Sequence, residues 1–432
     1  MSRSPSRVAN LSGCVRGTER PDLLLELSGY SVFFLIVAFL KSPTIFIDPR
    51  FWAEEGVTFY ARFLHLPFTS SIAFIKSGSI LVLTNAIVYI ATKVPTALAP
   101  AVTTYAALLL HLVVVCQIVL FVRAHSLAKM VGLLLVAAWA LLPQTFEVWL
   151  NATNIQWITG VSMLVFLAMP AGWIEQHWKG GAAWCLVCGL SGVPATVLAP
   201  FFFLRAFMER SFTILILAIV LSVTVVAQLA ILTDVGEPRP YLLDPWFLVM
   251  PLFLQSVLSP VLSAEVVDKI APSIVDRNSQ HVIMTTISVL IAGIGIMGFA
   301  TAAAYSGCRK PYVWLVLMAW LVVTIIQNFG SIDPRAELSG WAGGRYFLFG
   351  SMCLCLLLAW GTEARQTVPR VVSMGLLIAV MVSGIYTVAF SPWCRLELHG
   401  PSWRKQVKSC AVGHTCKIIV WPGGSWILEI EK

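Results

Sequence analysis

The feature that most limits what this chain can fold into is a series of long apolar runs that contain no charged residue. Two of them cover residues 212–232 and 282–305, close to the ~20 residues that a helix needs to cross a hydrocarbon core of about 30 Å. Hydrophobic residues make up 58% of the 432 positions, whereas soluble domains average about 45–50%. A membrane β-barrel would show alternating segments of about ten residues instead. We therefore predict an all-α, polytopic membrane protein.

The distribution of basic residues predicts the orientation of the chain. Residues 1–26 are rich in arginine and precede the first apolar run, 27–47. This arrangement is typical of a retained first span with a cytoplasmic amino end, and the run is too long for a cleaved signal. If successive spans alternate in direction from there, we predict about eleven transmembrane helices within residues 27–390. The net charge of +8 then reflects short basic cytoplasmic loops and not a nucleic-acid partner.

Three stretches do not fit simple crossings. Residues 64–97 hold a short apolar run, 80–91, that is followed by interrupting prolines, so we expect interface helices within a first extracytoplasmic loop at 48–97. Residues 174–181 (IEQHWKGG) read as a cytoplasmic loop, followed by a hairpin that returns to the cytoplasm at Arg205. Residues 247–262 contain two prolines and are expected to be re-entrant or interfacial.

Residues 391–432 form a small tail that is predicted to be extracytoplasmic. Its β-rich stretches at 417–420 and 425–430 flank a Pro-Gly-Gly turn, which is typical of a hairpin. In an oxidising compartment a disulfide such as Cys410 to Cys416 is possible, and a loosely ordered tail with free thiols is the alternative. The tail is too small to form a core alone, so we expect it to pack on the membrane domain.

The strongest candidate site is the segment 46–63, FIDPRFWAEEGVTFYARF, directly after the first span. It concentrates five charges in eighteen positions, although only 12% of the chain is charged. The acids are Asp48, Glu54 and Glu55. Acidic residues at a membrane span are functional by default. The alternative is a solvated loop whose aromatic side chains anchor it at the membrane interface.

The predicted topology brings four polar clusters to the same face of the membrane. The clusters are Asp48/Glu54/Glu55, Glu147/Asn151/Asn154/Gln156, Asp234/Glu237/Arg239/Tyr241 and Asp333/Arg335/Glu337/Arg345/Tyr346. Carboxylates can activate a hydroxyl group, and arginine can hold an anionic group. We therefore expect an outward-facing cavity that is suited to a reaction between a hydroxyl acceptor and an anionic donor.

With an acidic loop after the first span, interface helices and about ten further spans, the chain resembles the GT-C superfamily of membrane glycosyltransferases. The segment from Asp48 to Glu55 lies where that superfamily keeps its catalytic acid. Arg345 and Tyr346, in GGRYF at the head of a late span, are similar to positions that bind the donor phosphate. NATNIQW, residues 151–157, resembles a short motif of bacterial envelope proteins of this kind. The adjacent Asp-Asp or Asp-Glu pair usual in the family is absent as such.

The resemblance implies transfer of a sugar from a polyprenyl-phosphate donor to a hydroxyl of an envelope glycan or lipid, at the outer face of the bacterial inner membrane. Asp48 or Glu54 would be the base, with Glu55 in support. Arg345 and Tyr346 would bind the donor phosphate, which an arginine can stabilise without a metal. The sugar and acceptor would contact Trp52, Asn151, Asn154, Gln156 and Trp157. A divalent cation (Mg or Mn) held by the three acids stays open.

Other interpretations remain. Glu55 can pair with a loop arginine, NATNIQW can cap a helix, and Arg345 can pair with Asp333. A flippase or transporter is expected to place charges near the membrane midplane and to show internal repeats. A glycan polymerase or ligase is expected to have arginine-rich outer loops. Both stay as alternatives, although the sequence shows no convincing repeat and its outer loops hold at least as many acids as arginines.

Overall fold

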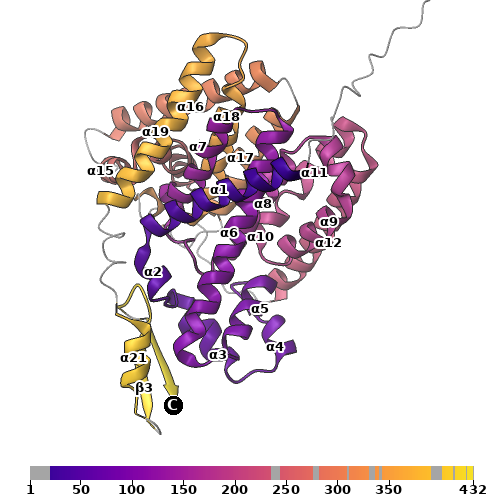
Figure 1. The fold of residues 1–432 in the computed structure, drawn as a ribbon. Coiled ribbons are helices and arrows are strands. Elements are labelled where there is room, and N and C mark those ends of the chain that lie inside the picture. The colour runs from indigo at the N-terminus through magenta and orange to yellow at the C-terminus, as the bar shows by residue number, and fades with distance from the viewer. Residues whose placement is uncertain are drawn as a thin grey trace, which may run out of the picture.

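The computed structural model describes residues 20–234, 244–275, 282–308, 311–329, 336–339, 343–390, 401–411, 414–424 and 426–431. These residues form a helical bundle with a small β-hairpin at one end (Figure 1). The longer helices are α1 (Arg20–Lys41), α5 (Val82–Ala91), α6 (Ala99–Ala124), α7 (Lys129–Leu141), α8 (Ile155–Leu167), α9 (Ala171–Gly189), α11 (Ala199–Glu209), α12 (Phe212–Asp234), α13 (Pro245–Phe253), α15 (Ala264–Val275), α16 (Val282–Cys308), α17 (Pro311–Phe329), α18 (Arg345–Gly361) and α19 (Thr367–Phe390).

Short elements connect these helices or end the chain. The short helical elements are α2 (Pro43–Ile47), η1 (Glu55–Tyr60), α3 (Ala61–Phe63), α4 (Phe68–Ile72), η2 (Thr96–Leu98), η3 (Pro143–Thr145), α10 (Val193–Thr196), η4 (Leu254–Leu258), α14 (Ser259–Leu262), η5 (Ala336–Leu338) and α21 (Trp403–Ser409). The strands are β1 (Ile75–Lys76), β2 (Ser79–Ile80), β3 (Thr415–Ile419) and β4 (Ile427–Glu431), and they pair as two antiparallel hairpins.

The described residues have the composition of an all-α membrane protein. Six stretches are long and apolar enough to cross a membrane: Asp22–Lys41, Thr96–Ala124, Phe212–Ile231, Pro245–Leu262, Val282–Gly307 and Thr367–Phe390. Large apolar side chains project from them, including Val226, Ile283 and Met284, which are 67–69% exposed. Apolar surface of this extent is expected to face lipid. Residues 247–262, predicted to be re-entrant or interfacial, lie within one of the six, Pro245–Leu262, by length and composition.

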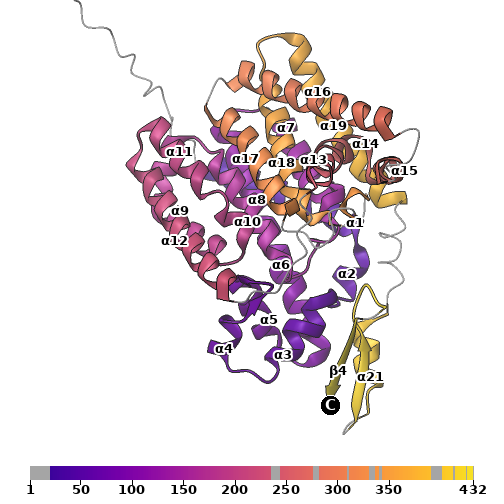
Figure 2. The ribbon, with the colours of Figure 1, turned by 180° about the vertical axis from the view of Figure 1, so that it is seen from behind.

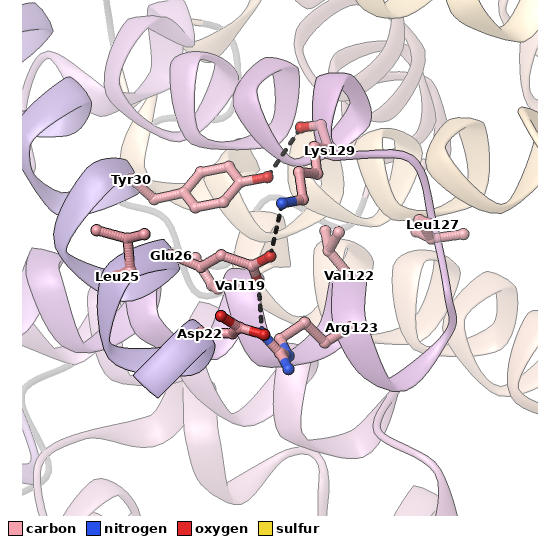
Figure 3. A pocket seen from close by; sticks show the side chains of 9 residues that line it. All are labelled: Asp22, Leu25, Glu26, Tyr30, Val119, Val122, Arg123, Leu127 and Lys129. Atoms are coloured by element: carbon pink, nitrogen blue, oxygen red, sulfur yellow. Dashed lines mark hydrogen bonds and ion pairs between the residues drawn. The ribbon is translucent and has the colours of Figure 1, made fainter. Parts of the chain in front are cut away.

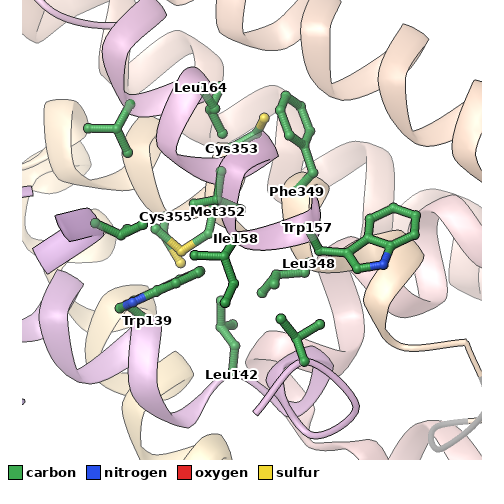
Figure 4. Close-up of a cluster of buried hydrophobic side chains, with 14 of the residues drawn as sticks. Trp139, Leu142, Trp157, Ile158, Leu164, Leu348, Phe349, Met352, Cys353 and Cys355 are labelled. Atoms are coloured by element: carbon green, nitrogen blue, oxygen red, sulfur yellow. The ribbon is translucent and has the colours of Figure 1, made fainter. Parts of the chain in front are cut away.

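Helix α18 forms the centre of the bundle. Every residue from Phe347 to Gly361 is buried, as expected of a helix that is apolar on all sides. Helices α7, α8, α16, α17 and α19 pack around it. Figure 4 shows how Phe349 and Met352 of α18 meet Trp139 and Ile158 from two neighbouring helices. This packing fixes the position of the first residue of α18, Arg345.

Residues 174–181, predicted to be a loop, lie inside helix α9. The helix continues through them with a kink at His177, where φ is −117° and ψ is 16°. The glycines in this stretch suggested a loop, but Gly181 has a packing role. A Cβ atom at Gly181 would lie 2.6 Å from the ring of Phe166 in α8. The small residue therefore lets α8 and α9 pack closely.

The side chain of Arg205 is fully buried, with 0% of its surface exposed. Its guanidinium donates hydrogen bonds to the backbone carbonyls of Leu167 and Met169, where α8 ends. It also forms an ion pair with Glu209 at 3.3 Å. Terminal carbonyls of a helix have no partner within the helix, so a cation supplies one. Arg205 thus joins α11 to α8 instead of marking a solvated loop. Figure 2 shows α9, α11 and α12 grouped at one side.

The C-terminal residues fold onto the other end of the bundle. Strands β3 and β4 form an antiparallel hairpin with Ile418 opposite Leu428, and a disulfide joins Cys410 to Cys416. Helix α21 packs on β3. In Figures 1 and 2 this group lies beside α2 and α3, next to the acidic loop. We call α21, β3, β4 and their connections the C-terminal module.

Candidate active site at the acidic loop

The acidic loop between α2 and η1 has an unusual backbone. Ala53 has φ +34°, in the left-handed region that non-glycine residues rarely adopt. Of the two acids that follow it, Glu54 directly precedes a π-helix and Glu55 begins that helix, which runs to Tyr60. π-Helical turns and residues in such sparsely populated conformations occur frequently at functional sites. The local geometry therefore marks the same residues that the sequence singled out.

Glu55 fastens this loop to the bundle. Its side chain is buried, and one carboxylate oxygen accepts the N–H of Trp52 at 3.0 Å. The other oxygen accepts the N–H of Ala152 at 2.7 Å. Burial raises the pKa of Glu55 from its ordinary value to about 7, although these amides and the Thr103 hydroxyl favour the charged form. Both carboxylate oxygens of Glu55 thus accept hydrogen bonds from backbone N–H groups.

Asn151 and Asn154 shape the turn that carries Glu147. Both side-chain amides donate to the carbonyl of Glu147, at 2.8 Å and 2.6 Å. The backbone N–H of Asn154 donates to the Asn151 side-chain oxygen at 3.0 Å. Leu150, within the turn, has φ +50°. The two asparagines therefore hold the loop that presents the Glu147 carboxylate.

Three charges from distant parts of the chain meet beside this turn. The guanidinium of Arg345 lies 3.9 Å from the Glu147 carboxylate, and the Arg345 N–H donates to the same oxygen at 3.4 Å. Glu54 also interacts electrostatically with Arg345. The side chains of Arg345 and Glu147 are 27% and 19% exposed. The pair is thus fixed by the fold and partly exposed to solvent.

Aromatic rings complete this group. The guanidinium of Arg345 lies 5.2 Å from the centre of the Tyr346 ring, which suits a cation–π contact. Trp157 meets Tyr346 edge-on, with 5.0 Å between ring centres. Arg345 and Tyr346, expected at the donor phosphate, therefore lie together with Trp157, expected at the sugar and acceptor.

Other predicted residues lie nearby in different settings. Asp48 is half-buried, and its Oδ1 is buried without a hydrogen-bond partner. The ring of Trp52 packs on Trp421, 4.4 Å between centres. A Cβ atom at Gly192 would lie 2.4 Å from the Cβ of Gln156, so Gln156 packs tightly against the α9–α10 connection. Glu237, Arg239, Tyr241, Asp333 and Arg335 lie outside the described residues, as does the side chain of Asp234.

Within the part of the chain that the structure describes, no three His, Cys, Asp or Glu side chains come close enough to hold a metal ion. Asp48, Glu54 and Glu55 therefore do not form the three-carboxylate cation site that the sequence left open. Glu55 instead uses both oxygens on backbone amides.

Lys41 is a polar feature that the sequence analysis did not use. Its ammonium donates to the carbonyl of Ala140 at 2.9 Å and to the hydroxyl of Thr145 at 2.7 Å. It also lies 3.8 Å from the centre of a Trp149 ring. A lysine at the end of an apolar run was the signal for this role. Lys41 joins α1 to the segment that leads to Glu147.

A cavity of about 450 Å³ lies at the far end of α1, away from the loop. Figure 3 shows its charged wall, where Glu26 pairs with Arg123 at 2.7 Å and Lys129 at 3.0 Å, while the Tyr30 hydroxyl donates to the Lys129 carbonyl. These pairs join α1 to α6 and α7, so the cavity wall is a structural contact.

We expect Glu26→Gln to lower the free energy of unfolding by about 1 kcal/mol, because the pairs are partly exposed and weakened by solvent. Unfolding of the purified protein in mild detergent measures this value. Asp22→Asn is the matched control, because Asp22 is an exposed acid on the same cavity wall. Equal effects of the two variants would contradict the structural role of Glu26.

Three comparisons with known proteins found no match: no family model matches the chain, and neither does any curated protein or solved structure.

Proposed function

We propose that this protein is a membrane glycosyltransferase of the GT-C type. It would move a sugar from a polyprenyl-phosphate donor to a hydroxyl of an envelope glycan or lipid. The observation that carries the proposal is the pairing of Arg345 with Glu147, within electrostatic range of Glu54, beside a strained acidic loop at the end of an apolar bundle. A reaction between a lipid phosphate and a hydroxyl needs both charges at such a place.

In this proposal Glu54 removes the proton from the acceptor hydroxyl, with Asp48 as the other candidate base. The hydroxyl oxygen attacks the anomeric carbon, and the bond from that carbon to the phosphate oxygen breaks. The phosphate leaves as an anion, which the guanidinium of Arg345 stabilises. Tyr346 and Trp157 line the same place and offer ring surface to the sugar or the prenyl chain.

The proposed topology has about eleven spans in the bacterial inner membrane and a cytoplasmic amino end. Five of the six long apolar stretches supply part of this number, since residues 247–262 are not counted as a crossing, so some of the shorter apolar helices must cross as well. The acidic loop and residues 391–432 would then be extracytoplasmic. A disulfide between Cys410 and Cys416 is compatible with that compartment.

The test compares the masses of envelope glycolipids in cells that contain the protein and in cells that lack it. A single added hexose or pentose that depends on the protein supports sugar transfer. A change only in glycan chain length contradicts it and favours a polymerase or ligase. A change only in which leaflet holds the glycolipid favours a flippase.

Arg345→Ala is expected to lower the initial rate of transfer about 100-fold, because the leaving phosphate loses its cation. The measurement uses purified protein at matched concentration, with a polyprenyl-phosphate sugar as donor. Arg365→Ala is the control, since Arg365 is an exposed arginine beyond the other end of α18. A similar loss in both variants would show that the effect is not specific to the site.

A further inference from the structure

The C-terminal module touches the acidic loop at its most strained residue. The N–H of Ala53 donates to the carbonyl of Trp421 at 2.6 Å. The Trp421 ring packs on Trp52, with 4.4 Å between ring centres, and lies 6.0 Å from Phe146. Trp421 thus contacts the two residues that directly precede the acids.

A second set of contacts keeps the module in this place. Trp403 of α21 meets Phe51 edge-on at 4.9 Å and donates from its indole N–H to the carbonyl of Thr96 at 2.8 Å. Gly56, within η1, lies directly beneath Val420. A Cβ atom there would lie 2.9 Å from a Val420 methyl group. The loop sequence therefore leaves room for the module to approach.

Hydrogen bonds to backbone N–H groups hold the loop from two sides. On the inner side, the carboxylate of Glu55 accepts the N–H of Trp52 and that of Ala152. On the outer side, the carbonyl of Trp421 accepts the N–H of Ala53. A non-glycine residue at positive φ is strained and persists only where its surroundings fix it.

We propose that Trp421 is a positioning residue that holds Ala53 in its left-handed conformation and thereby fixes the backbone from which Glu54 projects. The effect of Trp421 on sugar transfer rests on the proposed function, whereas its effect on the conformation of the loop does not depend on that function. Trp421 acts through the loop and need not touch a substrate. Its removal should slow the reaction step without weakening substrate binding.

The experiment measures hydrogen–deuterium exchange of the backbone amides of residues 52–56 in the purified full chain. For Trp421→Ala we expect exchange at least about 10-fold faster, with a smaller change for Trp421→Phe, which keeps a ring. Lys417→Ala is the matched control. Lys417 lies in the same hairpin, 74% exposed, and pairs only with Glu429 among the ion pairs of the described residues. It should leave exchange unchanged.

Exchange in α18 serves as the internal measure of folding. If Trp421→Ala also accelerates exchange in α18, the Gly56→Ala variant is tested in its place. The added methyl group at position 56 pushes Val420 away and leaves Trp421 in the chain. Faster exchange at 52–56 with α18 unchanged supports the proposal. Unchanged exchange at 52–56 in both variants overturns it.

Transfer assays on the same samples separate this inference from the proposed function. We expect kcat to fall about 10-fold in Trp421→Ala with KM nearly unchanged. Faster exchange with an unchanged kcat would overturn the positioning role. If the wild-type protein transfers no sugar from polyprenyl-phosphate donors, the proposed function fails, and the exchange result alone decides whether Trp421 holds the loop.

Discussion

Glu54→Gln is expected to lower the initial rate of sugar transfer about 1,000-fold, the usual effect of losing a general base. Glutamine keeps the size of the side chain but cannot accept the proton from the acceptor hydroxyl. It also removes the negative charge that interacts with Arg345. The measurement is the initial rate with purified protein, donor and acceptor at saturating concentrations.

Two further variants make this prediction specific. Glu363→Gln removes an exposed acid beyond the opposite end of α18 and is expected to leave the rate unchanged. Asp48→Asn tests the other candidate base. A large loss in Asp48→Asn, combined with a nearly normal rate in Glu54→Gln, would assign the proton transfer to Asp48 instead.

The second large effect concerns the stability of the loop and its dependence on pH. Burial raises the pKa of Glu55 to about 7, from an ordinary value of 4.5. The folded protein therefore holds this proton more tightly than the unfolded chain. The resulting stabilisation is fully present below pH 4.5 and is lost as the pH rises through about 7. The difference between these pKa values corresponds to about 3 kcal/mol.

Glu55→Gln is expected to remove this part of the pH dependence, because glutamine does not titrate. It should also destabilise the protein by about 1–3 kcal/mol, since the new NH₂ group faces a backbone N–H that needs an acceptor. The measurement is the free energy of unfolding in mild detergent at pH 5 and pH 8. Glu429→Gln, an exposed acid of β4, should keep the wild-type slope. Equal slopes for wild type and Glu55→Gln would refute this explanation.

The sequence predicted those features that depend on composition and local pattern. Apolar runs predicted an all-α membrane protein, and six long apolar stretches are present in the described residues. Alternating β-rich residues around the Pro-Gly-Gly turn predicted the hairpin that β3 and β4 form. The density of charge marked the loop where Glu54 and Glu55 lie. Each of these signals lies within about twenty consecutive residues.

Features that depend on how loops and helices pack in three dimensions were not predictable in the same way. Asn151 and Asn154 are polar enough to bind a sugar, and only the fold reveals that their amides reach the carbonyl of Glu147. In the sequence Arg205 resembles a loop residue, and only the fold reveals that its guanidinium donates to the carbonyls at the end of α8. Gly181 suggested a loop because sequence patterns do not distinguish a flexible glycine from one that permits close packing.

The contact between Ala53 and Trp421 also has a consequence for biosynthesis. Domains form progressively from the amino end as the ribosome elongates the chain. The segment that carries Glu54 and Glu55 emerges early, but its outer partner, Trp421, is translated much later. A nascent chain can therefore insert its helices well before this segment reaches its final conformation. A premature stop codon just before Trp421 would then yield an inserted protein that accumulates normally and is nearly inactive.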